Sequence, residues 1–161
     1  MPARFVADAM LKKLARWMRI FGVEVDYLDK EDNEILKFLA GHSDSILLTQ
    51  DVQLNERAKG RKLKSFLVPR DVSTEEQIAA VFREFGLSLS DFPSKTVCPA
   101  CNGKLLTVGG KEVEGKVLPA VLARHTKFWL CARCGKAYWE GTHWRKINEA
   151  AERVNSLLRA N

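Results

Sequence analysis

The residues whose chemistry is easiest to infer are four cysteines in two closely spaced pairs. Cys98 and Cys101 form the first pair (CPAC), Cys131 and Cys134 form the second (CARC), and 29 residues separate the pairs. Two such pairs on tight turns can supply four thiolates to one tetrahedral zinc ion. We therefore predict a zinc ribbon with these four cysteines as ligands, and the alternative is four unrelated thiols. Since four sulfurs leave no position for water, the predicted zinc is structural, and any reaction must occur elsewhere.

Carboxylates follow predicted strands at points where a reaction could take place. Asp8 follows the first predicted strand, Asp51 follows the third, and Asp32 and Glu34 lie at the start of the second predicted helix. The carboxyl ends of neighbouring parallel strands form a binding crevice, so Asp8 and Asp51 converge if strands one and three are neighbours. Clustered carboxylates repel unless a cation lies among them, and Mg²⁺ or Mn²⁺ prefers oxygen ligands. Each of these acids could instead only cap or begin a helix.

A divalent cation at this position would suit phosphodiester hydrolysis, because it can activate water and neutralise charge on the phosphate. The basic residues Lys13, Arg16 and Arg19 follow Asp8 on the first predicted helix and could bind substrate phosphates. The alternative for these three residues is a solvated basic face.

Strand-like and helix-like segments alternate through the first ninety residues. We predict strands at residues 4–7, 23–28, 45–49 and 63–68, and helices at residues 8–21, 32–41, 52–59 and 73–85. Such alternation predicts an α/β fold with a parallel sheet and helices on both faces. In the first helix, apolar residues at helical spacing predict a buried face, with the basic residues off it: Leu11, Leu14, Ala15, Met18 and Phe21.

Three segments are predicted along the chain. Residues 1–94 form the α/β domain, residues 95–141 form the zinc ribbon with strands near 104–108 and 127–130, and residues 142–161 form a helix. The heptad-like apolar spacing of that helix predicts packing on the domain or on a partner, and it permits a homodimer. Gly103 and Gly135 follow the two cysteine pairs, where turns often require positive φ.

The basic charge is concentrated in the cysteine-containing part. The net charge is +6, of which residues 95–161 contribute +7 before zinc binding and residues 1–94 contribute −1. Four thiolates with one zinc ion would leave about +5 in the second part, which favours either simple solubility or attraction to a polyanion such as nucleic acid. No apolar run reaches the length of a membrane span, so we expect a cytoplasmic protein without a membrane partner.

Aromatic residues gather around the second cysteine pair. Trp129, Tyr138, Trp139 and Trp144 alternate with basic residues and could stack on unpaired bases. The simpler interpretation is that they form the small core of the ribbon and its contact with the main domain.

Several motifs together resemble the Mut-seven C-terminal RNase domain, a PIN-like ribonuclease family. The opening motif of that family corresponds to Asp8, Met10, Leu11, Leu14, Ala15, Arg16, Trp17, Arg19 and Gly22. Its Leu-Thr-x-Asp motif corresponds to residues 48–51, and its cysteine module corresponds to residues 98–102 and 131–144. The sequence departs from the family at Lys12, Glu24 and Gln50, where Gly, Asp and a basic residue are common.

The resemblance implies a PIN-like fold, an acidic Mg²⁺ or Mn²⁺ site and a fused zinc ribbon. We expect a ribonuclease, with internal cleavage of RNA, that uses Asp8, Asp32 and Asp51 as catalytic metal ligands and Lys13, Arg16 and Arg19 as phosphate ligands. One alternative is a catalytically inactive PIN-like module that binds RNA or protein. Others are a toxin-type RNase with an antitoxin partner, and a phosphotransfer enzyme with Asp8 as nucleophile.

Overall fold

A four-stranded parallel sheet forms the centre of the N-terminal part. The computed structural model describes residues 3–160, and the strand order in the sheet is β2-β1-β3-β4. Its strands are β1 (Arg4–Asp8), β2 (Val25–Leu28), β3 (Ser45–Thr49) and β4 (Lys64–Leu67). The predicted α/β fold is therefore confirmed, and strands one and three are neighbours in parallel register.

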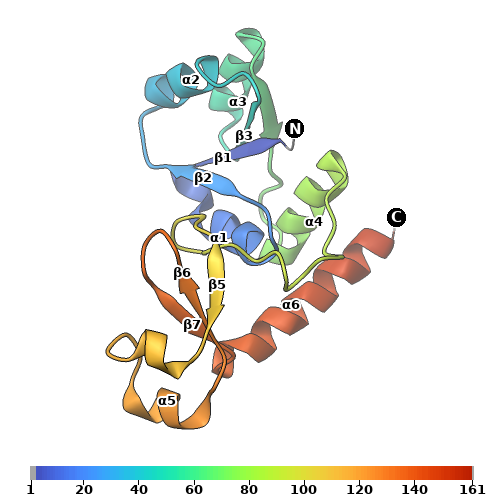
Figure 1. The fold of residues 1–161 in the computed structure, drawn as a ribbon. Coiled ribbons are helices and arrows are strands. Elements are labelled where there is room, and N and C mark those ends of the chain that lie inside the picture. Colours follow the sequence, from blue (N-terminus) through green and yellow to red (C-terminus); the bar gives the residue numbers. More distant parts are fainter. Residues whose placement is uncertain (1–2, 161) are drawn as a thin grey trace.

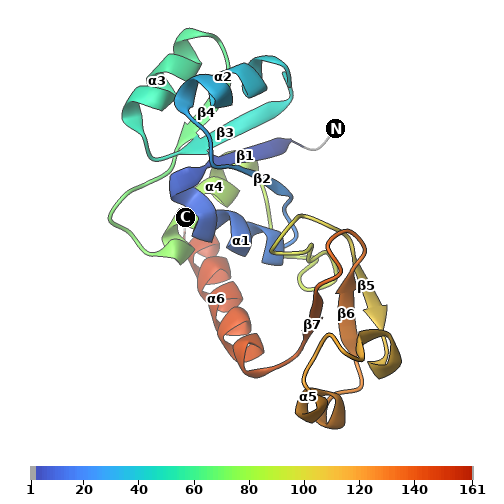
Figure 2. The ribbon, with the colours of Figure 1, turned by 90° about the vertical axis from the view of Figure 1, so that its left-hand side faces the viewer.

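Helices cover both faces of this sheet (Figures 1 and 2). One face carries α1 (Lys12–Ile20) and α4 (Thr74–Phe85), with α6 (Thr142–Arg159) packed on α4, and the other carries α2 (Asp32–Ala40) and α3 (Val52–Gly60). Along β1, Phe5 and Ala7 contribute to the first core, whereas Val6 contributes to the second. This alternation follows from the two-residue period of a strand, and burial on both sides explains why the central strands are continuously apolar.

Local signals fix the helix ends close to the predicted positions. A three-residue 3-10 turn (Ala9–Leu11) leads from β1 into α1, and Gly22, with φ of 91°, follows the end of α1. Ser73 caps α4 in a capping box with Glu76, and Gly86 ends that helix with φ of 64°. The predicted strand at 23–28 begins later, at Val25, because Val23 still bonds back to the helix.

A second, three-stranded antiparallel sheet lies in the C-terminal part, in the order β5-β6-β7. Its strands are β5 (Leu105–Val108), β6 (Phe128–Cys131) and β7 (Ala137–Trp139). A 3-10 turn (Gly110–Val113) and the short helix α5 (Pro119–Arg124) lie between β5 and β6. Neither α5 nor β7 was among the predicted elements, because segments this short carry little periodicity.

The last helix returns to the N-terminal part. Ala150, Ala151 and Val154 of α6 are buried in the same core as α1 and α4. A homodimer or protein partner on α6 stays a prediction and would use another face of this helix. The division at residues 1–94, 95–141 and 142–161 likewise stays a prediction, and residues 1, 2 and 161 lie outside the described residues.

Candidate functional site

Two aspartates lie at the carboxyl edge of the sheet, at the point where strand order reverses. The chain passes from β1 outward to β2 and then returns to the other side of β1 to form β3. Asp8 ends β1, and Asp51 follows β3 by two residues. In open parallel sheets this reversal opens a crevice for ligands.

Thr49 connects the two aspartates. Its hydroxyl donates a short hydrogen bond to Oδ2 of Asp8 and accepts one of 3.0 Å from the backbone N–H of Asp51. The second oxygen of Asp8 accepts from the N–H of Met10 at 3.1 Å, and Oδ1 of Asp51 accepts from the N–H of Leu54 at 3.1 Å. Both acids therefore act as helix caps, which fixes their orientation.

The carboxyl group of Asp8 is placed where its negative charge is unfavourable. The residue is only 5% exposed. Burial raises the pKa of Asp8 above its usual value, and the nearby negative charges of Asp51 and Asp32 raise it further. Hydrogen bonds from Thr49 and Met10 act in the opposite direction without cancelling the effect. A cation bound at this edge would stabilise the ionised carboxylate of Asp8 and reduce its repulsion with Asp51 and Asp32.

Asp32 lies in the first turn of α2, within electrostatic range of Asp8. Its carboxylate is 3.4 Å from the guanidinium of Arg57, with both side chains about half exposed. The cap of α2 is Glu31 instead, in a capping box with Glu34. Asp32 is therefore free of the capping role, whereas Glu34 is held by the backbone of Glu31.

The acids do not form a compact ligand cluster as they stand. Among residues 3–160, the only group of three or more His, Cys, Asp or Glu side chains with ligand atoms within 4.8 Å of one another consists of the four cysteines. Metal binding by Asp8, Asp32 and Asp51 would thus require their side chains to approach one another.

The three predicted phosphate ligands differ in their surroundings. Lys13 and Arg16 are exposed on α1. Arg19 is only 7% exposed, and its guanidinium donates to the carbonyl of Val25 at 2.6 and 2.9 Å and to that of Pro99 at 2.8 Å. The prediction that Arg19 lies on the exposed face is wrong, because the first cysteine turn and the edge of the sheet cover that end of the helix. Arg19 holds these two segments together and is not available to substrate.

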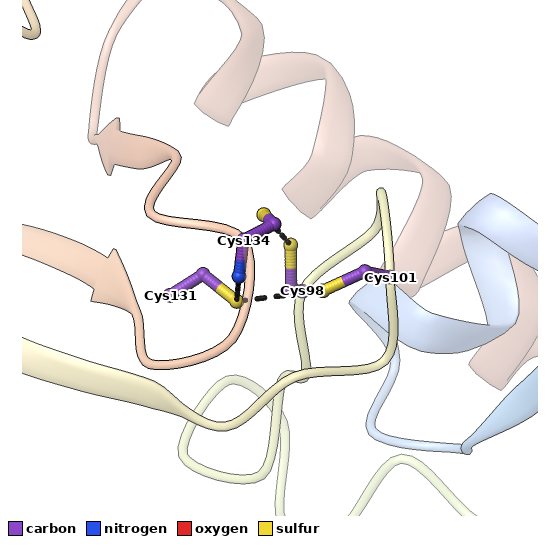
Figure 3. Close-up of side chains that lie close together, drawn as sticks. All are labelled: Cys98, Cys101, Cys131 and Cys134. Atoms are coloured by element: carbon purple, nitrogen blue, oxygen red, sulfur yellow. Dashed lines mark hydrogen bonds between the residues drawn. The ribbon is translucent and has the colours of Figure 1, made fainter.

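The four cysteines converge from two turns (Figure 3). The sulfurs of Cys98 and Cys134 are 3.8 Å apart, and those of Cys101 and Cys131 are 3.5 Å apart. Zinc–sulfur bonds of about 2.3 Å in a tetrahedron place sulfurs about 3.8 Å apart. The donor set and its spacing therefore fit a structural zinc ion.

Backbone N–H groups favour the thiolate form of one cysteine, whereas burial raises the pKa of the Cys101 thiol to about 11. Burial opposes ionisation of Cys131, but the N–H groups of Cys134 and Arg133 point at its sulfur and lower the pKa of this thiol to about 6. The hydroxyl of Tyr138 lies 3.1 Å from the sulfur of Cys98. Since burial raises the pKa of Tyr138, its hydroxyl stays protonated and can donate to a thiolate.

Position 103 requires glycine because two cysteine sulfurs and Arg133 lie close to its Cα atom. A Cβ atom there would collide with the sulfur of Cys131, and it would lie 2.9 Å from Cβ of Arg133 and 3.1 Å from the sulfur of Cys101. The predicted positive φ is found at Gly135, at 76°, but beside Gly103 it is Asn102 that adopts it. The reason for glycine at position 103 is therefore space and not backbone conformation.

Together these features define a class of protein: an α/β domain with a parallel sheet and aspartates at its switch point, joined to a four-cysteine module that could bind zinc. The chain belongs to the Mut7-C RNAse domain family, whose model matches residues 3–151. No curated protein and no solved structure matches the chain. Membership in this family indicates a ribonuclease-like function. Among the described residues, no helix is both long and apolar enough to cross a membrane.

Sequence reasoning assigned no role to Thr49, although it connects Asp8 with Asp51. The available signal was its place two residues before Asp51 in the Leu-Thr-x-Asp motif. A fully buried hydroxyl at the end of a strand needs a hydrogen-bond partner, and the nearest candidates are side chains at the same sheet edge.

Proposed function

We propose that the protein is a metal-dependent ribonuclease that cleaves RNA phosphodiester bonds within the strand. The observation that carries this proposal is the buried carboxylate of Asp8, held at the switch point beside a second aspartate, with its pKa raised. Perturbed carboxylates in a crevice are candidate functional groups. Membership in the Mut7-C RNAse domain family supports the choice of RNA as substrate.

Asp8, Asp51 and Asp32 would hold Mg²⁺ or Mn²⁺ at this edge. Such an ion, when bound, activates water and neutralises negative charge on the phosphate. Thr49 fixes the orientation of the Asp8 carboxylate at this edge through its short hydrogen bond. We choose Asp32 as the third acid over Glu34, because Glu34 already closes a capping box and Asp32 contributes to the raised pKa of Asp8.

Lys13 and Arg16 would bind substrate phosphates. Both are exposed on α1, which follows Asp8 and its 3-10 turn. An RNA chain whose phosphates are bound by these two residues would therefore extend to the acidic edge of the sheet. Arg19 has no part in this role, since its guanidinium is committed to two backbone carbonyls. Zinc at the four cysteines would be structural, and the ribbon would assist RNA binding.

The test is cleavage of a circular single-stranded RNA by the zinc-loaded protein, with Mg²⁺, Mn²⁺ or EDTA. A circle has no ends, so only internal cleavage gives product. We expect cleavage with a divalent ion and a loss of at least about hundredfold in Asp8→Asn and Asp51→Asn. Asp44→Asn, which changes an exposed aspartate in the turn before β3, is the matched control and should retain activity.

A second candidate is a catalytically inactive module that binds RNA. The observation in its favour is that Asp8 and Asp51 both cap helices and that the three acids do not form a compact group. Folded, zinc-loaded protein that binds RNA but cleaves neither circular nor linear RNA with any divalent ion would establish this second function.

A further inference from the structure

A cleft of about 1000 Å³ lies between α1, the ribbon and α6. All four tryptophans of the chain line it: Trp17 from α1, Trp129 and Trp139 from the ribbon, and Trp144 from α6. Figure 2 shows the backbone of α1, β7 and α6, three of the elements that contribute lining residues. Segments far apart in the sequence thus contribute the same residue type to one surface.

The simpler interpretation of the sequence, that the aromatic residues form the core of the ribbon and its contact with the main domain, holds only for the contact: Trp144 stacks on Phe92, which packs against the main core. The fully buried apolar side chains of the ribbon are Phe128 and Val113, whereas the tryptophans are half-buried. The rings of Trp129 and Trp144 are stacked, with centroids 6.1 Å apart and planes 19° from parallel. Trp144 lies between Trp129 and Phe92, whose ring centre is also 6.1 Å away, and both tryptophans line the cleft.

The charge of the cleft has one sign. Among residues 3–160, its lining includes five Lys or Arg residues and no Asp or Glu: Lys12, Lys13, Arg16, Lys127 and Lys146. All five are exposed. The ammonium of Lys127 lies 5.1 Å from the centre of the Trp129 ring, so one cation sits directly beside the aromatic stack. A groove of this kind attracts a polyanion with flat, apolar groups between its charges.

We infer that this cleft binds a segment of single-stranded RNA, with bases stacked on the tryptophans and phosphates bound by the surrounding lysines and Arg16. Unpaired bases are required, because the rings can stack only on bases whose faces are accessible. An acidic peptide would match the charge but would leave the aromatic surface without flat partners.

Helix α1 connects this cleft with the acidic edge. Its exposed face contributes Lys12, Lys13 and Arg16 to the cleft, and the 3-10 turn before Lys12 leads directly back to Asp8. Nine helical residues span about 14 Å. RNA bound along α1 would therefore reach Asp8 with one end of the bound segment. This last step rests on the proposed ribonuclease function, whereas binding in the cleft does not.

Binding can be measured through the protein's own fluorescence, since every tryptophan lies in the cleft. The zinc-loaded protein is titrated with unlabelled oligo-uridine in the presence of citrate at a concentration that removes Mg²⁺ but not zinc, so that no cleavage occurs. We expect strong quenching by single-stranded RNA and much weaker quenching by a blunt RNA duplex. Equal affinity for both, or none for either, would overturn the inference.

Variants then separate stacking from charge. Trp129→Leu keeps apolar bulk but removes the ring and should weaken binding about tenfold, whereas Trp129→Phe should retain most of the affinity. Lys127→Gln should lower the affinity and reduce its salt dependence, while Lys59→Gln on α3 should change neither. Unchanged affinity in both Trp129→Leu and Lys127→Gln would overturn the inference. Displacement of the bound RNA by poly-glutamate as effectively as by unlabelled single-stranded RNA would also overturn it. Zinc content and melting temperature confirm that each variant is folded.

The two proposals fail separately. Tryptophan-dependent binding without cleavage in Mg²⁺ or Mn²⁺ would remove the ribonuclease function but leave the cleft as an RNA site. Cleavage that is unaffected by Trp129→Leu at limiting RNA concentration would leave the ribonuclease and remove the cleft.

Discussion

Asn102 pairs with both backbone groups of Val25, much as a neighbouring strand would. Its Oδ1 accepts from the N–H of Val25 at 3.0 Å, and its Nδ2 donates to the carbonyl of Val25 at 2.7 Å. Val25 begins β2 at the edge of the main sheet, and Asn102 directly follows Cys101. One side-chain amide therefore fixes the first cysteine turn to the α/β domain, beside the bonds made by Arg19.

Replacing Asn102 with glycine should destabilise the protein by about 2 kcal/mol, because the two hydrogen bonds to Val25 and a longer one to Asp26 are lost. Glycine keeps the backbone conformation, since Asn102 has φ of 69°. The matched control is Lys62→Gly, which changes an exposed residue with φ of 61°. Urea unfolding followed by far-UV circular dichroism measures both variants, and equal stability of the two would contradict the role of the amide.

Gly103→Ala should lower zinc affinity by at least about tenfold, because a Cβ atom there occupies space needed by the sulfurs of Cys101 and Cys131. Competition with a coloured zinc chelator measures the affinity. Gly60→Ala provides the control, since no atom lies within 4 Å of a Cβ placed there. If Gly103→Ala binds zinc as tightly as the control, the cysteine turn can accommodate a Cβ atom without loss of zinc affinity, and the prediction is wrong.

Asp8→Asn should raise the melting temperature at pH 7 by about 3 °C when divalent ions other than zinc are absent. The variant removes a buried charge and its repulsion with Asp51 and Asp32. Because the folded-state pKa of Asp8 is raised, the destabilisation is present above that pKa and disappears below the ordinary value of 3.8. The difference between wild type and variant should therefore shrink as pH falls, and a difference that grows instead would contradict this account.

Mg²⁺ or Mn²⁺ should reverse that order of stability. An ion that binds only the folded state stabilises it in proportion to the logarithm of its concentration. We expect the melting temperature of wild type to rise with millimolar Mn²⁺, and that of Asp8→Asn to stay constant. Equal responses would place the ion elsewhere, and this result is obtained without any activity measurement.

The ion pair between Glu75 of α4 and Arg153 of α6, 2.8 Å apart, should make helix docking sensitive to acid. The hydrogen bond from Arg153 lowers the pKa of Glu75 below its ordinary 4.5. Its stabilisation is therefore present above pH 4.5 and is lost as pH falls through the lowered pKa. Arg153→Gln should be less stable than Arg145→Gln at pH 7, and the two should converge in acid. Arg145 pairs within α6 alone, which makes it the control.

The sequence was sufficient for elements whose signals are local. The Ser73 capping box, the apolar run of β3 and the paired cysteines each depend on neighbours a few residues away. Their positions could therefore be predicted without the tertiary structure. The alternation of elements predicted a parallel sheet, but the pairing of β1 with β3 was only a condition in the sequence argument and was found in the structure.

Arg19 could not be placed from the sequence, because its burial depends on the cysteine turn eighty residues further along. Helical spacing gave some indication, since Arg19 lies one turn after the buried Ala15. The same reason applies to the tryptophans. Spacing identified Trp129, Trp139 and Trp144 as a group without Trp17, and only the return of α6 towards α1 brings Trp17 and Trp144 to the same cleft.

The amide of Asn102 also protects the main sheet from other chains. β2 is an edge strand, and unpaired N–H and carbonyl groups on an edge attract strands from neighbouring molecules. The first cysteine turn covers the start of that edge only while the turn keeps its shape. Loss of zinc would therefore affect more than the ribbon, because it would expose the edge of β2 to pairing with strands of other molecules. We expect chelation to lead to aggregation as well as to local unfolding.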